Sequence, residues 1–307
     1  MPDHLLIPSR LGAELARADA DIQLHAVDLD TGGEVAVAAD QQVVIASVAK
    51  ILIVLEFARQ AASGQLDPGA HLTIRSEDRL GGWGIAGCAD DVEISLRDCA
   101  YFAMSLSDNT AADVIVRRVG GDAVEMLVAE LGLERTRFLG GPRHLLRSMY
   151  ADLGARDDRE FAARYRALSP AERRRSLSVF DPRRTTSSTA RDMTRLLGLI
   201  WHDRAGPADA CAAVRRLMTR QLSSTRLASG FPPPVTVAAK SGTLPGVHME
   251  AGVVRYPDGH RYALAVFATA RDLHARPADL DETIGRVAHA AVQTIREGHG
   301  DARPSSS

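Results

Sequence analysis

The chain has 307 residues, of which 45% are apolar and 25% charged, a mixture typical of a globular protein with a substantial core. Its formal net charge is −2, and short arginine runs such as Arg173-Arg174-Arg175 are no basic block, so nucleic-acid binding has no support. No run of about 20 apolar residues predicts a membrane span. We therefore expect a small-molecule partner, no nucleic acid, no membrane and a monomer.

Cysteine and histidine usage favours a reduced protein without a bound metal. Cys88, Cys99 and Cys211 are too few, and odd in number, for a disulfide framework. The ten histidines and the cysteines show no metal-ligand spacing, so neither a metal nor another cofactor is expected. The first thirty residues lack the basic start and apolar stretch of a secretory leader, so we expect a cytoplasmic protein, or a secreted one only if a leader was removed.

The N-terminal elements indicate a helix, a hairpin and a second helix. Apolar residues recur at helical spacing over residues 5–20. Residues 21–40 alternate in polarity on both sides of the turn Asp30-Thr31-Gly32-Gly33, which is typical of a β-hairpin. A β-branched run then stops at Ala46, and residues 49–63 have the pattern of an apolar helix.

Helical periodicity dominates the middle of the chain, to about residue 222. Residues 168–188 lack a clean period, and we expect them to form a long loop. The other helices of this region are predicted at 95–104, 108–119, 121–131, 142–152, 156–167, 189–202 and 207–221.

Strands return near the C-terminal end. Residues 235–243 form a short β-branched run, and residues 248–270 predict two apolar strands around the turn Pro257-Asp258-Gly259. Residues 278–296 indicate a closing helix. Strands at both ends of the chain predict one sheet faced by the terminal helices.

This order of elements predicts two lobes. Residues 1–48 and 223–299 would form a discontinuous α/β lobe, and residues 49–222 an all-helical lobe. The tail, residues 300–307, is expected to be disordered. A cleft between two such lobes is the natural place for a site.

The stretch Ser47-Val48-Ala49-Lys50 has a chemical rationale at the start of an apolar helix. Residues three apart share a helix face, so the Lys50 side chain can reach the Ser47 oxygen. A desolvated lysine with cationic neighbours has a lowered pKa and can act as a base. The helix N-terminus offers N–H groups to a developing oxyanion. Alone, the stretch also fits a capping serine and a surface lysine.

Two further segments accompany it in a fixed order. Ser107-Asp108-Asn109 precedes a predicted helix, where an Asp is usually an N-cap. Lys240-Ser241-Gly242-Thr243 ends a predicted strand, and Gly242 suits a strand that a substrate approaches closely. The three segments resemble the S-x-x-K, S-D-N and K-T-G motifs of the class A β-lactamase and penicillin-binding protein superfamily. SDNTAADVIVRRVGG and DPRRTTSSTARDMTRLL also look like the family's segments, so the resemblance covers nearly the whole chain.

The resemblance implies the fold and the catalytic roles. The fold would be α+β, an α/β/α sandwich around an antiparallel sheet plus an all-α lobe. Ser47 would be the acylated nucleophile, Lys50 its base or proton relay, and Ser107 the donor to the leaving nitrogen. Lys240 would hold Ser107 and the substrate carboxylate electrostatically. The N–H groups of Ser47 and Thr243 would form the oxyanion hole.

The resemblance also implies a substrate-binding set. Asn109 would bond the substrate amide, and Ser241 or Thr243 its carboxylate. Arg226 matches a substrate-carboxylate arginine, and Trp83 an aromatic gatekeeper. The complete set is Asn109, Ser241, Gly242, Thr243, Arg226 and Trp83.

The glutamate that activates the deacylating water in class A β-lactamases has no clear counterpart. Glu172 falls near the expected place, but the family's Leu-Asn does not follow it. Ser169-Pro170 also fits a helix cap and first residue, which would make Glu172 a helix-start glutamate. Glu160 is a second, more distant candidate. His248 and Glu250 would be either a local general base or an exposed strand end.

Three functions follow from these residues. The one we favour is a serine hydrolase that opens β-lactams through an acyl-Ser47 intermediate, with Glu172 or a substitute positioning water. The second is an ester, amide or peptide hydrolase or acyltransferase that lacks this glutamate. The third is a β-lactam-binding protein without turnover.

Overall fold

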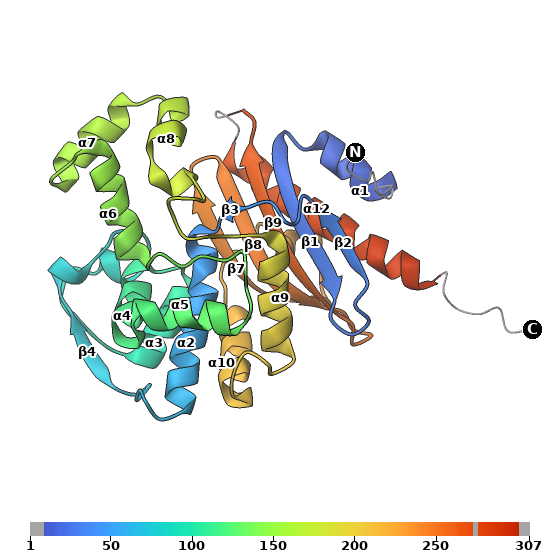
Figure 1. Cartoon of the computed structure of the whole chain (residues 1–307), viewed down its shortest axis with the longest axis horizontal. Coiled ribbons are helices and arrows are strands. Elements are labelled where there is room, and N and C mark those ends of the chain that lie inside the picture. The colour runs from blue at the N-terminus through green and yellow to red at the C-terminus, as the bar shows by residue number, and fades with distance from the viewer. Residues whose placement is uncertain (1–8, 273–275, 301–307) are drawn as a thin grey trace, which may run out of the picture.

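The computed structural model describes residues 9–272 and 276–300. Five antiparallel strands form the main sheet, in the order β2-β1-β9-β8-β7. Figure 1 shows this sheet with helices on both faces and further helices beyond its β7 edge. The strands are β1 (Ala20–Asp28), β2 (Glu34–Val37), β7 (Thr236–Leu244), β8 (Val247–Arg255) and β9 (Arg261–Ala270).

Two apolar cores lie on the two faces of the sheet. In β9, Leu264 and Val266 belong to one core, while the alternate residues Ala265 and Phe267 belong to the other. Successive side chains of a strand point to opposite faces, so both faces of β9 are covered and the strand is apolar throughout. One face is covered by α12 (Pro277–Gly300) with α1 (Ser9–Arg17) packed on it, and the other by α9 (Ala190–Trp201).

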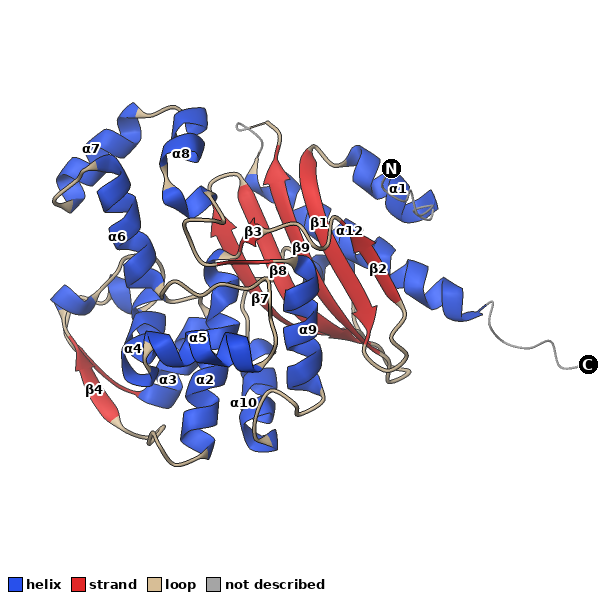
Figure 2. Ribbon diagram, viewed as in Figure 1, coloured by secondary structure: helices blue, strands red, loops and turns tan. Residues whose placement is uncertain are grey.

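Helices α3 (Leu96–Ser105), α4 (Asn109–Val119), α5 (Gly121–Glu130) and α10 (Ala208–Met218) pack around α2 (Lys50–Ala62), beyond the β7 edge of the sheet in Figure 2. The first nine residues of α2, Lys50–Ala58, are all buried, because helices pack around it on several sides. The other described helices are α6 (Pro142–Leu153), which packs on α4, α7 (Asp158–Ala167), which packs on α6, α8 (Pro170–Ser176), and α11 (Leu227–Gly230), which packs on α12.

Two short strand pairs lie outside the main sheet. They are β3 (Val43–Val44) with β6 (Ser187–Ser188), and β4 (His71–Ile74) with β5 (Val92–Ser95). The expected α+β fold with an antiparallel sheet is confirmed. Among the described helices, none is both long and apolar enough to cross a membrane.

Several expectations needed correction. The loop expected at 168–188 contains α8, which Ser169 caps and Pro170 begins, so the Ser-Pro signal outweighed the poor period. The pair β4–β5 was not predicted, because each strand has only four residues. Residues 301–307 of the expected tail lie outside the described residues. The division into lobes at residues 48 and 223 stays a prediction.

Candidate active site

A cavity of about 240 Å³ lies between the start of α2, the edge strand β7 and helix α6. It brings together Ser47, Lys50, Asn109 and Thr243, which come from three distant stretches of sequence. Its wall consists of Ala46, Ser47, Ala49, Lys50, Ile53, Leu80, Asn109, Gly140, Gly141, Pro142, Leu145, Leu146, Met149, Thr186, Thr243 and Leu244.

Ser47 lies in a tight turn of 3-10 helix, η1 (Ala46–Ala49), which leads directly into α2. Ala46 has φ +39°, a left-handed conformation that is uncommon for a residue other than glycine. Val48 and Ala49 are buried and hold the turn against the core, while Ser47 stays half-buried at the cavity. Strained backbone held by surrounding packing is typical of functional sites.

Strand β7 passes very close to this turn at Gly242. A Cβ atom built on Gly242 would lie 3.1 Å from the carbonyl oxygen of Ile45 and 2.9 Å from Cγ of Met249. Any side chain here would push β7 away from the turn that carries Ser47. Glycine therefore allows the backbone of Thr243 to approach the nucleophile.

Lys50 is buried, with 2% of its surface exposed. Its Nζ donates to the carbonyl oxygen of Ser107 at 2.5 Å and to Oδ1 of Asn109 at 2.9 Å, and it lies 3.2 Å from Oγ of Ser107. Burial holds the pKa of Lys50 well below its usual value, and the charge of Lys240 lowers it further, while Asp108 opposes the shift. In the neutral amine, the Ser107 hydroxyl can donate to the free lone pair. The arrangement suits a proton acceptor.

In the Ser107-Asp108-Asn109 segment, Ser107 and Asn109 contact Lys50, whereas Asp108 stabilises the backbone. Ser107 has φ +60°, and this left-handed conformation turns both its carbonyl and its hydroxyl toward Lys50. Asp108 is the N-cap of α4, as an Asp before a helix predicts, and accepts from the Ala111 N–H at 2.9 Å. It also accepts from the Ile85 N–H at 2.7 Å.

The second buried lysine, Lys240, has no exposed surface. Burial lowers its pKa to about 7, with Glu250 opposing the shift and Arg226 adding to it. Its Nζ donates to the carbonyl oxygen of Ser241 at 2.8 Å. The two amines with lowered pKa values are close enough for the charge of Lys240 to act on Lys50, but only Lys50 lines the cavity.

The outer edge of β7 has backbone N–H groups that point away from the sheet, and that of Thr243 is beside the cavity. The Ser241 N–H points outward, because it donates to Oε1 of Gln221 rather than to the neighbouring strand. Outward groups recur every second residue in an antiparallel strand, so the Thr243 N–H points the same way. Thr243 lines the cavity beside Ser47. This arrangement is compatible with the predicted oxyanion hole.

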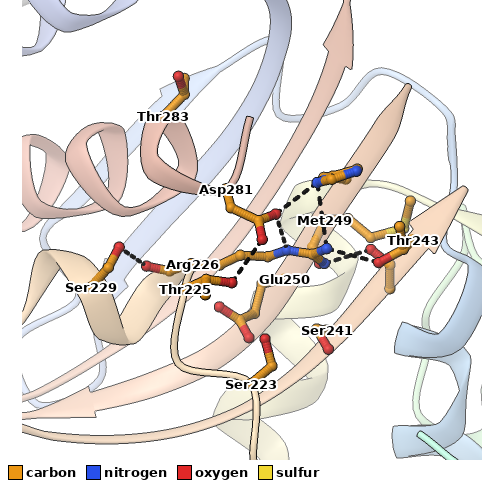
Figure 3. Close-up of polar contacts among 12 residues, drawn as sticks. Ser223, Thr225, Arg226, Ser229, Ser241, Thr243, Met249, Glu250, Asp281 and Thr283 are labelled. Carbon is orange, nitrogen blue, oxygen red and sulfur yellow. Dashed lines mark hydrogen bonds and ion pairs between the residues drawn. The ribbon is translucent and has the colours of Figure 1, made fainter. Parts of the chain in front are cut away.

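Arg226 is buried, and its guanidinium bonds to neighbouring groups of the protein (Figure 3). Its Nε donates to Oδ1 of Asp281 at 2.6 Å, and its Nη1 donates to the carbonyl oxygens of Gly242 at 2.7 Å and Met249 at 2.9 Å. Its Nη2 donates to Oγ1 of Thr243 at 2.7 Å. The structure therefore connects Arg226 to the cavity through Thr243 and the strand that carries it.

His248 and Glu250 are buried rather than exposed at a strand end. Nδ1 of His248 lies 2.6 Å from Oδ1 of Asp281. Although partial burial raises the pKa of the Asp281 carboxyl, hydrogen bonds from His248 and Thr225 and the charge of Arg226 hold this pKa well below the usual range. Glu250 accepts from the Leu227 N–H at 2.6 Å and from Nε2 of Gln221 at 2.5 Å, while burial raises its pKa. Gln221, which the sequence analysis missed, thus bridges Glu250 and the edge of β7.

Trp83 is 82% exposed and is not part of the cavity wall. Its loop contains Gly84 at φ +89°, where a Cβ atom would lie 2.2 Å from Oδ2 of Asp108. The loop is thus pressed against the N-cap of α4, and Leu80 rather than Trp83 reaches the cavity.

The two glutamates considered for deacylation lie elsewhere. Glu172 is in the capping box of α8, where its carboxylate accepts from the Ser169 N–H at 2.8 Å and from the Ser169 hydroxyl at 2.6 Å. These bonds lower the pKa of Glu172. Glu160 forms an ion pair with Arg156. Within the described residues, no Asp or Glu lines the cavity.

The comparison with known families identifies the family of the chain. A family described as "Beta-lactamase enzyme family" matches residues 8–295. The chain belongs to this family. A relative in Streptomyces cacaoi, named β-lactamase regulatory protein BlaB, is 26% identical over 289 residues, which cover 88% of this chain and 91% of that protein.

Solved structures of β-lactamases and related proteins have the same fold. A β-lactamase from Sphaerobacter thermophilus aligns with a TM-score of 0.75 and 22% identity over 97% of this chain and 98% of that chain. A variant of PBP-A, solved as an acyl-enzyme complex with penicillin G, aligns with a TM-score of 0.72 and 20% identity over 94% of each chain. The class A β-lactamase from Mycobacterium abscessus aligns with a TM-score of 0.75 and 17% identity over 94% of this chain and 99% of that chain. The predicted β-lactamase-like fold is therefore confirmed.

Proposed function

We propose that Ser47 is acylated by β-lactams or by closely related amides, and that the acyl-enzyme persists. The observation that carries the proposal is the position of Lys50. This buried amine with a lowered pKa shares a cavity wall with Ser47 and contacts both Ser107 and Asn109. A serine hydroxyl needs such a base to become a nucleophile.

Acylation would proceed in two steps. Neutral Lys50 takes the proton from Ser47 Oγ as this oxygen attacks the amide carbonyl, and the N–H groups of Ser47 and Thr243 stabilise the oxyanion. The carbon–nitrogen bond then breaks, and the leaving nitrogen takes the proton of the Ser107 hydroxyl. The Lys50 ammonium returns a proton to Ser107 Oγ, 3.2 Å away, so the serine proton ends on the leaving nitrogen.

Substrate recognition would use the β7 edge. A substrate carboxylate would bond to Ser241 or Thr243 and gain electrostatic stabilisation from Lys240 when that amine is charged. Asn109, whose side-chain oxygen already accepts from Lys50, keeps its side-chain N–H₂ group for a substrate amide oxygen. Arg226 would act as a positioning residue, because its own bonds fix Thr243 and the carbonyl oxygen of Gly242.

Slow release of the acyl group is the second part of the proposal. Hydrolysis of an acyl-serine needs a base that activates water. The carboxylate of Glu172 is already engaged by Ser169, and no acidic side chain lies in the described cavity wall. The similarity to BlaB, which is named a regulatory protein, also favours binding over turnover.

Hydrolysis of β-lactams stays the second candidate, because the chain belongs to the β-lactamase family. In that case another group, such as Lys50 itself, would activate the water. The alternative of an ester or peptide hydrolase uses the same Ser47, Lys50 and Ser107. The cytoplasmic location and the monomeric state stay predictions.

A time course of intact protein mass with benzylpenicillin tests the proposal. We expect an adduct that forms on Ser47 and remains for hours, with Ser47→Ala as the unlabelled control. An adduct that appears and then clears would instead establish hydrolysis. If penicillins leave the mass unchanged while simple esters are consumed, the site serves another substrate class.

A further inference from the structure

Helix α6 presents large apolar side chains that no core covers. None of its twelve residues is buried. Leu145, Leu146 and Met149 are half-buried and line the cavity that contains Ser47. None of these three side chains packs on the two apolar cores of the described residues. Apolar side chains kept out of a core and turned to a cavity are typical of a ligand-binding wall.

The cavity consequently has two different halves. Ser47, Lys50, Asn109 and Thr243 supply polar groups on the side of α2, α4 and β7. The opposite wall is formed by the apolar side chains of α6, and further apolar residues, namely Leu80, Ile53 and Leu244, line the cavity elsewhere. A ligand whose reactive amide meets the polar half must therefore place its remaining bulk against an apolar surface.

Bonds near both ends of α6 hold this surface in place. At the N-terminal end, Nε of Arg143 donates to Oδ2 of Asp113 at 2.9 Å, and its Nη2 donates to the carbonyl oxygen of Asp78 at 3.0 Å. Near the C-terminal end, Asp152 accepts from the Ser178 N–H and hydroxyl, both at 2.6 Å, and pairs with Arg184 at 2.7 Å. The apolar wall is thus preformed, which lowers the entropic cost of binding a ligand there.

We infer that the site selects acyl donors with a bulky apolar acyl group, which lies against Leu145, Leu146 and Met149. This inference rests on the proposed acylation of Ser47 and names the substrate class of that site. Burying one methylene favours binding enough to change an equilibrium constant about fourfold. The preference should therefore grow with acyl chain length until the wall is covered.

The test uses one penicillin nucleus with a graded side chain. 6-Aminopenicillanic acid is N-acylated with acetyl, butyryl, hexanoyl or octanoyl groups, and the second-order rate constant of Ser47 acylation is measured from intact mass. Because each member has two more methylenes than the one before, we expect this constant to rise by about 15-fold from each member to the next, up to the length that fills the wall. A constant that is independent of chain length would overturn the inference while leaving the acylation of Ser47 established.

Matched variants of α6 locate the effect. Leu146→Gln and Met149→Gln should flatten the length dependence, whereas Met149→Leu, which keeps the wall apolar, should preserve it. Arg147→Gln is the control, because Arg147 is exposed on the same helix and is not part of the cavity wall. All variants should fold, since the substituted side chains belong to neither core. If Leu146→Gln and Met149→Gln leave the dependence of the acylation rate constant on chain length unchanged, the acyl group does not lie against α6.

A failure of the proposed acylation can be distinguished from a failure of the inferred apolar subsite. If no member of the series modifies the protein, acylation by penicillins is excluded, and the same series is then titrated non-covalently against Ser47→Ala. Dissociation constants that fall with chain length would support the apolar subsite on its own. Constants that do not change with length would overturn it.

Discussion

The two sides of the cavity are built in opposite ways. Residues 46–50, on one side, lead into the most buried helix of the described chain, and Lys50 is 2% exposed there. On the other side, α6 and the helices α7 and α8 that follow it contain no buried residue. The residues proposed for the chemistry are thus continuous with the core, whereas the opposite wall lies at the periphery of the molecule. Substitutions in the first region should change catalysis and stability together, and those in the second should change selectivity with little effect on stability.

The strongest test of this division is the removal of the base. Lys50→Met should lower the rate of Ser47 acylation by about 10²- to 10⁴-fold, the usual contribution of a general base. The fold should survive, because a buried amine is replaced by an apolar side chain of similar length. Mass labelling gives the rate, and denaturant unfolding gives the stability. Acylation within tenfold of the unsubstituted protein would remove Lys50 from the mechanism.

Breaking the ion pair between Arg226 and Asp281 should destabilise the protein and weaken the binding of anionic substrates. Asp281→Asn leaves the Arg226 guanidinium, which is buried, without its carboxylate. We expect a loss of about 3 kcal/mol in the free energy of unfolding, as for other broken buried pairs. Binding of anionic substrates should also weaken, because Arg226 holds Thr243.

The control for this pair is Arg156→Gln, which breaks an exposed pair with Glu160 on α7. It should change the unfolding free energy far less than Asp281→Asn. Equal losses from the two substitutions would contradict the contrast between the core-linked and peripheral sides.

The lowered pKa of Lys240 predicts a pH dependence with a definite sign. Its pKa is about 7 in the folded protein and 10.5 in an ordinary environment. Between these values the unfolded chain binds a proton that the folded protein does not, so the free energy of unfolding should rise with pH from about 7 to 10.5. Acylation by an anionic substrate should fall as the pH rises through about 7, where Lys240 of the folded protein loses its charge.

Lys240→Met is the comparison for both measurements. It should remove this component of the stability profile and make acylation slow at every pH. A variant with the same pH profile of stability as the unsubstituted protein would show that another group is responsible.

The smallest effect is expected at Glu172. Because its carboxylate accepts hydrogen bonds at the start of α8, Glu172→Gln should leave the acylation rate and the lifetime of the adduct nearly unchanged. Intact-mass kinetics on both proteins provide the measurement. If the variant traps an adduct that the unsubstituted protein clears, Glu172 would be the deacylating base, and the peripheral side would carry chemistry after all.

Local patterns predicted most helices, and the motif order predicted which residues meet. Ser47, Lys50, Asn109 and Thr243 share one cavity because S-x-x-K, S-D-N and the lysine strand occupy fixed places in this fold. The inward contacts of Arg226 could not be predicted, because its partners Asp281 and Met249 come from other elements. A charged residue's direction depends on such long-range contacts and leaves no periodic signal.

The apolar wall of α6 was missed for a related reason. The sequence predicted a helix at 142–152 with the usual apolar spacing, and that spacing is the same whether a helix faces a core or a ligand. Only the positions of Leu145, Leu146 and Met149 relative to Ser47 distinguish the two cases.

The pairing of β1 with β9 has a consequence for biosynthesis. Ala20 pairs with Ala270, so the centre of the sheet joins the first strand to the last. The helices around α2 lie between these strands in the sequence and can pack while the ribosome is still extending the chain. The edge of β7, which completes the cavity beside Ser47, can join the sheet only when β8 and β9 have been synthesised. A nascent chain therefore carries its nucleophile long before it has a site in which that nucleophile can react.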